Sequence, residues 1–140
     1  MKNMTKKALR ENYLRMKLME SQLSSEAEKK SAIEQSLEEM DRTLDSLSEL
    51  RDSGATDSFF TLGSGFYLEA SIKDSNRIFI NMGSGVLSAR NLEDAISILN
   101  DRIGNANESL KAIEHSILYI SEEIRRTEER MNLLSTHEGA

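Results

Sequence analysis

The sequence contains no cysteine, no proline and no tryptophan in 140 residues. The lack of cysteine excludes disulfides, thiolate metal sites and cysteine nucleophiles. Because proline breaks the interior of a helix, its absence favours long uninterrupted helices. Aromatic residues make up only 5% of the chain, so a thick globular core would lack large side chains. The length fits one domain.

Basic residues are also scarce relative to acidic ones, 18 against 24, which gives a net charge of −6. Nucleic-acid binding is disfavoured as a main role, because phosphate binding needs a basic face. The chain has no apolar run of about 18 residues that could span a membrane. Residues 1–10 lack the apolar core of a signal peptide. We therefore expect a cytoplasmic protein with neither nucleic acid nor membrane as a partner.

Glycine divides the chain into three regions. Residues 1–53 contain none, residues 54–90 hold five of the seven, and residues 91–136 hold one. The outer regions are rich in helix formers, whereas the middle region holds most of the aromatic residues. We expect a single α+β domain with a long antiparallel two-helix coiled coil, formed by 1–53 and 91–136, around two central β-hairpins in 54–90.

Apolar residues in the third region recur at alternating steps of three and four, which is the pattern of a coiled-coil seam. These positions are Leu92, Ile96, Leu99, Ile103, Ala106, Leu110, Ile113, Ile117, Ile120, Ile124, Thr127, Met131 and Leu134. The first region follows the same spacing at Leu9, Asn12, Met16, Met19, Leu23, Glu26, Lys30, Ile33, Leu37, Met40, Leu44, Leu47 and Arg51. Each helix must bury its seam, and the nearest partner is the other helix. In the antiparallel register that we expect, the numbers of facing residues sum to about 143.

Four short runs of β-forming residues lie in the middle region, at 59–62, 66–72, 77–82 and 86–89. The segment Leu-Gly-Ser-Gly-Phe at 62–66 recurs as Met-Gly-Ser-Gly-Val at 82–86. Since glycine tolerates the positive φ of tight turns, each copy predicts one β-hairpin. Two isolated hairpins with exposed edges are not stable in water, so the region predicts an oligomerisation platform. The residues expected to form it are Phe60, Leu62, Gly63, Gly65, Phe66, Leu68, Ile72, Ile78, Ile80, Met82, Gly83, Gly85 and Val86.

Other interpretations of these motifs are weaker. Neither Gly-Ser-Gly copy is followed by the lysine and the helix of a phosphate-binding loop. Ser64 and Ser84 have no histidine nearby in sequence that could activate them. His115 and His137 are far apart and lack metal-ligand spacing. We therefore predict no catalytic residue, metal site or cofactor, and we do not expect an enzyme.

The order of elements resembles the α-class subunit of the prefoldin family over nearly the whole chain. The most specific parts are residues 60–70 and 78–85, which look like the family's paired hairpin signatures. Two hairpins point to the α class, because β-class subunits are similar but carry one. The chain departs from the family pattern in lacking a proline before the first strand and in having Ala70 where a glycine often stands.

The resemblance implies a hexamer of two α-class and four β-class subunits. In it, the hairpins form intersubunit β-barrels and the coiled coils project from them. It also implies an ATP-independent holdase that captures non-native client proteins and transfers them to a group II chaperonin. By the same analogy, the charged run at 122–130 docks the chaperonin, although a solvated helix face is the simpler interpretation.

Methionines gather near the start of the chain, at Met1, Met4, Met16 and Met19. Methionine is flexible and polarisable, which suits surfaces that accept many shapes. The candidate client-binding residues at the ends of the two helices are Leu9, Tyr13, Leu14, Met16, Met131, Leu133 and Leu134. Those at seam positions serve equally as core residues. A structural coiled-coil scaffold that joins defined partners would explain the helices as well as a chaperone does.

Overall fold

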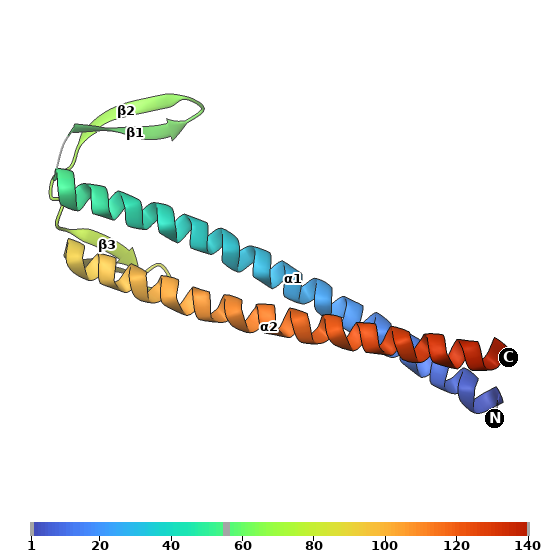
Figure 1. The fold of residues 1–140 in the computed structure, drawn as a ribbon. Helices are drawn as coiled ribbons and strands as arrows, with labels where there is room; N and C mark the ends of the chain where they lie inside the picture. Colours follow the sequence, from blue (N-terminus) through green and yellow to red (C-terminus); the bar gives the residue numbers. More distant parts are fainter. Residues whose placement is uncertain (1, 55–56, 140) are drawn as a thin grey trace. The chain divides into compact units, whose positions relative to one another are not determined.

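The computed structural model describes residues 2–54 and 57–139, with side chains from residue 4 to residue 136 of these ranges (Figure 1). The elements in chain order are α1 (Lys2–Ser53), β1 (Asp57–Gly63), β2 (Phe66–Ser71), β3 (Ile78–Asn81), β4 (Leu87–Arg90) and α2 (Leu92–Gly139). Two long helices around two β-hairpins confirm the expected α+β class. The predicted end of the second helix, at 136, falls three residues short.

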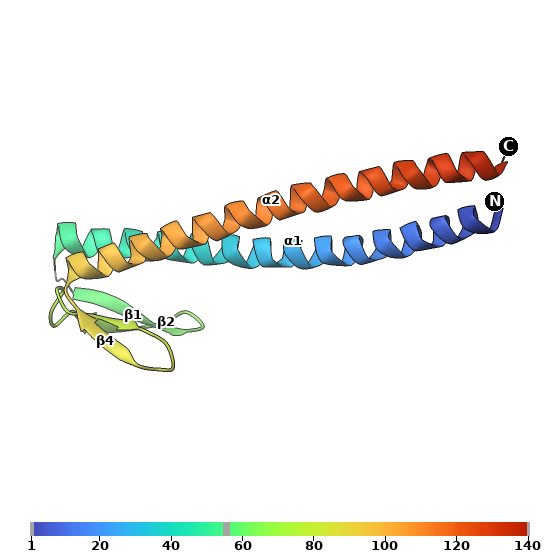
Figure 2. The ribbon, with the colours of Figure 1, turned by 90° about the horizontal axis from the view of Figure 1, so that it is seen from below.

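The chain divides into two compact units, each of which contains parts of both helices. The terminal unit comprises Met1–Gln35 and Asn107–Ala140, and the hairpin unit comprises Ser36–Ala106. In the terminal unit, the first half of α1 lies beside the second half of α2 and runs antiparallel to it (Figures 1 and 2). The hairpin unit contains all four strands between the end of α1 and the start of α2.

The seam positions predicted from three-four spacing are buried or half-buried in both units, with Arg51 as the exception. Thr127, the one polar seam residue in α2, is fully buried, and its hydroxyl donates a 2.8 Å hydrogen bond to the carbonyl oxygen of Glu123. A threonine satisfied within its own helix can therefore occupy an otherwise apolar seam. The spacing alone thus located the buried stripe of each helix.

Two ion pairs join the helices of the terminal unit. Arg15 lies 3.8 Å from Glu123, and Lys30 lies 4.0 Å from Glu114, measured between side-chain nitrogen and oxygen atoms. Both pairs fall within about one and a half helical turns of the register expected from the seam. Lys30, a charged interruption of that seam, is thus half-buried with an acidic partner on the facing helix.

Asparagine side chains fix the beginning of α2. The Oδ1 atom of Asn91 accepts a 2.8 Å hydrogen bond from the backbone N–H of Asp94, as expected of a helix N-cap. The Oδ1 atom of Asn76, in the preceding loop, accepts a 3.0 Å hydrogen bond from the backbone N–H of Leu92. Two of the otherwise unpaired N–H groups of the first turn are therefore satisfied, and the loop before β3 is tied to the helix.

The two Gly-Ser-Gly copies form the hairpin turns, as the sequence predicts. In the first copy φ is +96° at Gly63, +53° at Ser64 and +80° at Gly65, and the second copy follows the same sequence of positive angles. Only glycine adopts such angles readily, so the serine in the middle carries the strain of each turn. The repeated sequence therefore encodes a repeated backbone conformation.

The strands form two separate two-stranded antiparallel sheets. In the first hairpin Phe60 pairs with Leu68, and in the second Phe79 pairs with Ala89. The predicted run 77–82 extends beyond β3 at both ends, and the run 86–89 is shifted by one residue from β4, because Met82 and Val86 belong to the turn. The backbone N–H of Met82 donates a 2.9 Å hydrogen bond to the carbonyl oxygen of Val86. Ile72 lies just beyond the end of β2.

The core of the hairpin unit is built mainly by the helices. Its buried members are Leu47, Leu92, Ala95 and Leu99, and the half-buried residues packed around them are Met40, Leu44, Leu50, Ile78, Ile80, Ile96 and Ile103. Ile78 and Ile80 come from β3, which lies alongside α2. The second hairpin is thus anchored to the helices, whereas β1 and β2 contribute no side chain to this cluster.

Replacing Gly104 with alanine is expected to stabilise the chain by about 0.5–1 kcal/mol. Gly104 lies inside α2, and a Cβ atom built on it would meet nothing within 4 Å. The matched control is Gly54→Ala at the end of α1, where φ is +70° and the substitution should destabilise the chain. Urea unfolding monitored by helical circular dichroism measures both variants. A destabilised Gly104→Ala variant would contradict an open environment at this position.

Candidate functional site

The first hairpin exposes an apolar surface on both of its sides. Since side chains alternate along a strand, Phe60, Phe66 and Leu68 lie on one face, while Phe59 and Tyr67 lie on the other. All five side chains are exposed. We call the Phe60, Phe66 and Leu68 side the aromatic face. Monomeric proteins rarely leave large apolar patches uncovered, so this face is a candidate interaction surface.

The second hairpin has one face covered by its own chain and one face open. Ile78 and Ile80 point toward the helices, while Phe79 and Leu87 on the opposite side are exposed. The guanidinium of Arg77 lies 5.1 Å from the centroid of the Phe79 ring, in a cation–π contact. Figure 2 shows both hairpins beside the end of α1 and the start of α2.

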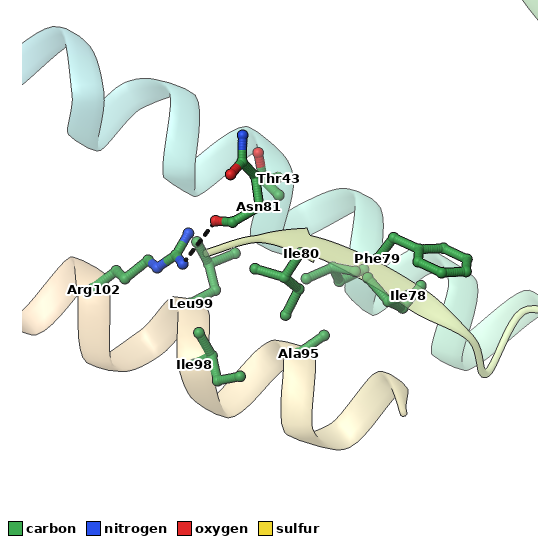
Figure 3. A pocket seen from close by; sticks show the side chains of 10 residues that line it. Thr43, Ile78, Phe79, Ile80, Asn81, Ala95, Ile98, Leu99 and Arg102 are labelled. Carbon is green, nitrogen blue, oxygen red and sulfur yellow. Dashed lines mark hydrogen bonds between the residues drawn. The ribbon is translucent and has the colours of Figure 1, made fainter. Parts of the chain in front are cut away.

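A pocket of about 220 Å³ lies between β3 and the two helices (Figure 3). Leu47, Ile80 and Leu99 supply part of its apolar wall. At its polar end, Arg102 donates a 3.4 Å hydrogen bond to the carbonyl oxygen of Asn81. The pocket is thus lined mainly by apolar side chains, and the guanidinium of Arg102 is already hydrogen-bonded to the backbone. Such a lining suits packing rather than catalysis.

The structure divides the predicted assembly residues into two groups. Ile78 and Ile80 contact the helical core of their own chain, and Ile72 is half-buried. The others are exposed on strands or turns: Phe60, Leu62, Gly63, Gly65, Phe66, Leu68, Met82, Gly83, Gly85 and Val86. The exposed members therefore form the part of the predicted platform that is free for another chain.

The predicted client-binding residues also divide into two groups. Tyr13 is 48% exposed, Leu14 60% and Leu133 71%, as expected for apolar residues outside the seam. The seam members are half-buried between the helices: Leu9, Met16, Met131 and Leu134. Met4 is exposed, and Met1 lies outside the described residues.

Sequence reasoning missed three further exposed apolar residues of the terminal unit, namely Leu18, Leu118 and Tyr119. Leu18 and Tyr119 border an open groove of about 260 Å³ whose wall also includes the Arg15–Glu123 pair. They lie farther from the chain ends than the residues predicted to bind clients. The available signal was their large apolar side chains at positions outside the heptad seam.

The charged run of α2 forms a network along the helix surface. Arg125 lies 2.6 Å from Glu122 and also pairs with Glu129, while Arg126 pairs with Glu123. The hydrogen bond from Arg125 is the main cause that lowers the pKa of Glu122, and the same pair raises the pKa of Arg125. These pairs join residues three or four positions apart on one helix, so the network supports α2.

The described part of the chain contains neither a group of metal-ligating side chains nor a helix suited to span a membrane. The side chains described in residues 4–54 and 57–136 include no group of three or more histidine, aspartate or glutamate residues that could hold a metal ion. His115 is exposed on α2, and the side chain of His137 lies outside the described residues. Neither described helix combines the length and apolar character needed to cross a bilayer.

Comparison with known protein families identifies the family to which this chain belongs. The family model described as "Prefoldin subunit" matches residues 19–137. The chain belongs to the prefoldin family. The resemblance of the hairpin motifs is thereby confirmed, and prefoldin is a chaperone family rather than an enzyme family.

Two relatives of known family agree with this membership. The prefoldin subunit alpha of Methanocorpusculum labreanum is 30% identical over 78 residues, which cover 56% of this chain and 53% of that protein. The prefoldin subunit alpha of Methanospirillum hungatei is 24% identical over 102 residues, covering 73% and 68% respectively. The matched region thus spans about half the length of the first of these relatives.

A cryo-EM structure of filamentous prefoldin from Methanocaldococcus jannaschii has the same fold. Its TM-score is 0.70 at 14% identity, and the match covers 81% of this chain and 95% of that one. At such low identity the likeness concerns the fold alone.

Proposed function

We propose that this prefoldin-family chain is an α-class subunit of an ATP-independent holdase. The observation that carries the proposal is the set of apolar side chains outside the seam of the terminal unit, with Tyr13, Leu14 and Leu133 exposed. A coiled coil needs its seam residues buried, but it gains nothing from large apolar residues that face water. These side chains are therefore available to bind other proteins.

Capture would depend on many weak contacts. Burying one such side chain against a client contributes roughly 1.5–3 kcal/mol. A single terminal unit would hold a client weakly, whereas several units on one assembly would hold it through avidity. Half-buried Met16 and Met131 add flexible, polarisable surface at the edge of the seam. Such a surface suits unfolded chains of varied sequence better than one defined ligand.

The proposed partners follow from the family. We expect the exposed hairpin residues to join β-class subunits in a hexamer of two α and four β chains, with intersubunit β-barrels in its body. We expect captured clients to pass to a group II chaperonin in the cytoplasm. The two-stranded hairpins, which are too small to be stable with open edges, support assembly of this kind.

The double variant Tyr13→Ser with Leu133→Ser should weaken client binding without affecting assembly. Two exposed apolar side chains are lost from each terminal unit, and each contributes roughly 1.5–3 kcal/mol to client binding, so about a hundredfold higher concentration of complex or more should be needed to suppress aggregation. Light scattering with several unrelated unfolded proteins measures this, using the complex with a β-class partner. The matched control, Ala27→Ser with Ala32→Ser, changes exposed positions of α1 in the same unit.

Unchanged suppression by the double variant would contradict capture by these residues. The scaffold alternative is tested by the same assay. A scaffold would bind one defined partner tightly and would suppress the aggregation of none of the unrelated clients.

A further inference from the structure

All the sulfur of this chain is in methionine. The sequence has seven methionines and no cysteine. Five of the seven belong to the terminal unit, and the hairpin unit contains only Met40 and Met82. Peroxides oxidise accessible thioether sulfur, and this chain offers them no thiol in its place. Such an oxidant therefore acts mainly on the unit that we propose to capture clients.

The described methionines of the terminal unit differ in their access to solvent. Met4 is 77% exposed and lies outside the predicted seam, whereas Met19 lies within the seam and is 8% exposed. Met16 and Met131 are half-buried seam residues, one on each helix. We call these two residues the accessible seam methionines. Each of them is partly open to solvent and also packs between the helices.

Polar groups that are already present in this seam are satisfied within their own helices. The hydroxyl of Thr127 donates its hydrogen bond to the carbonyl oxygen of Glu123. In the same way, Nδ2 of Asn12 donates a 2.8 Å hydrogen bond to the carbonyl oxygen of Ala8. A carbonyl oxygen in a helix has a second lone pair that can accept such a bond. The seam therefore tolerates polar side chains that are donors.

Methionine sulfoxide is a polar side chain of the opposite kind. In its formation by hydrogen peroxide, the O–O bond breaks, an S–O bond forms, the sulfur loses two electrons and water leaves. The sulfoxide oxygen only accepts hydrogen bonds, and the N–H groups in the interior of a helix are already paired with carbonyl oxygens. Water is the readiest remaining donor, so oxidation draws the side chain out of the seam.

We propose that Met16 and Met131 form an oxidation-sensitive site that regulates client capture. Their conversion to sulfoxides weakens the packing between the two helices and removes flexible apolar surface from the terminal unit. A methionine sulfoxide reductase reverses the change, and its reducing equivalents come from outside this chain, which has no thiol. The inference rests on the proposed holdase function and adds a means of regulation to the same unit.

The other seam residues show that packing in this unit does not depend on sulfur. On α2, four successive seam positions of the terminal unit are isoleucines: Ile113, Ile117, Ile120 and Ile124. Leucine and methionine have similar volumes and replace each other at small cost in a core. Leucine at the accessible seam methionines should therefore keep the seam apolar while removing the oxidisable sulfur.

Leucine substitution tests the site in the complex with a β-class partner. The complex is treated with dilute hydrogen peroxide, freed of it, and assayed by light scattering with several unrelated unfolded proteins. The oxidised wild type should need at least about tenfold more complex to suppress aggregation, the effect of one lost apolar contact. Met16→Leu with Met131→Leu should need nearly the same amount before and after treatment. The partner's methionines are identical in both samples.

The matched control is Met40→Leu with Met82→Leu. It removes one half-buried and one exposed methionine from the hairpin unit and leaves the accessible seam methionines in place. Its suppression of aggregation should fall on oxidation as far as that of the wild type. Treatment of the oxidised wild type with a methionine sulfoxide reductase should restore suppression.

Two further measurements do not depend on clients. Peptide mass spectrometry should find Met4, Met16 and Met131 oxidised at peroxide doses that leave Met19 reduced. Urea unfolding of the full chain, followed by helical circular dichroism, should show that oxidation destabilises the wild type more than Met16→Leu with Met131→Leu.

The inference is overturned if the oxidised wild type suppresses aggregation as well as the untreated complex, or if the Met16 and Met131 variant loses as much as the wild type. Protection by the Met40 and Met82 variant would also overturn it, because the sensitive site would then lie in the hairpin unit. A complex that suppresses no aggregation before oxidation contradicts the proposed function itself. Equal urea stability of the oxidised and untreated chains contradicts the oxidation-sensitive site instead.

Discussion

Leu99→Ala is expected to destabilise the hairpin unit by about 2–5 kcal/mol, the range for removing a leucine from a well-packed core. Leu99 is 8% exposed and lies in one cluster with Leu47, Leu92 and Ala95. The truncation leaves a cavity directly beneath the isoleucines of β3, so the helices and the second hairpin should weaken together. Chemical denaturation of the full chain gives the change in the free energy of unfolding.

The matched control is Leu118→Ala on the same helix. Leu118 is 69% exposed, so its truncation should change stability by less than about 0.5 kcal/mol. Hydrogen exchange adds a local readout, because the amides of β3 should lose protection in Leu99→Ala and keep it in Leu118→Ala. Equal effects of the two substitutions would contradict the buried position of Leu99.

The helices could be predicted because the features that specify them are local. A coiled-coil seam is a spacing along one chain, so Leu44, Leu47 and Leu99 could be assigned to a buried stripe before their neighbours were known. The turns were predictable for the same reason, since Gly63 and Gly65 adopt positive φ without help from distant residues. Local rules thus accounted for the helices and the turns.

The difference between the two hairpins could not be predicted from the sequence. Phe60 and Leu68 lie on one face of a hairpin, as Ile78 and Ile80 do, and the apolar residues at these alternating positions assign both sets to a covered face. The structure shows that Ile78 and Ile80 pack against the chain's own helices. The side chains of the aromatic face are exposed instead. An alternating pattern indicates that one face of a strand is buried, but it does not indicate which chain covers that face.

The exposed apolar residues of the terminal unit could not be predicted from the coiled-coil spacing, for a related reason. Three of them lie outside the seam, namely Leu18, Leu118 and Tyr119. Coiled-coil packing does not require a particular residue type at such positions. The heptad rule identifies residues that the helices need for each other. It does not account for large exposed apolar residues such as these three, which are therefore candidates for a binding surface.

Replacing Phe60 and Phe66 with serine should abolish assembly with a β-class partner while the helices stay folded. Both side chains belong to the aromatic face of the first hairpin and are exposed in the single chain. Burying each phenylalanine contributes roughly 1.5–3 kcal/mol, so the pair accounts for about a hundredfold to ten-thousandfold in affinity. The first hairpin gives no side chain to the Leu47 and Leu99 cluster, so helical circular dichroism should be unchanged.

The opposite face of the same hairpin supplies the control. Phe59→Ser with Tyr67→Ser removes a similar apolar area from the side that also carries Asp57 and Glu69. A barrel interior excludes water and disfavours unpaired carboxylates, so the aromatic face should point inward and the acidic face outward. Native mass spectrometry with the β-class partner should therefore show a much larger loss for Phe60 and Phe66. A larger loss for Phe59 and Tyr67 would reverse the two faces, because the interior would then have to pair or neutralise two carboxylates in each copy.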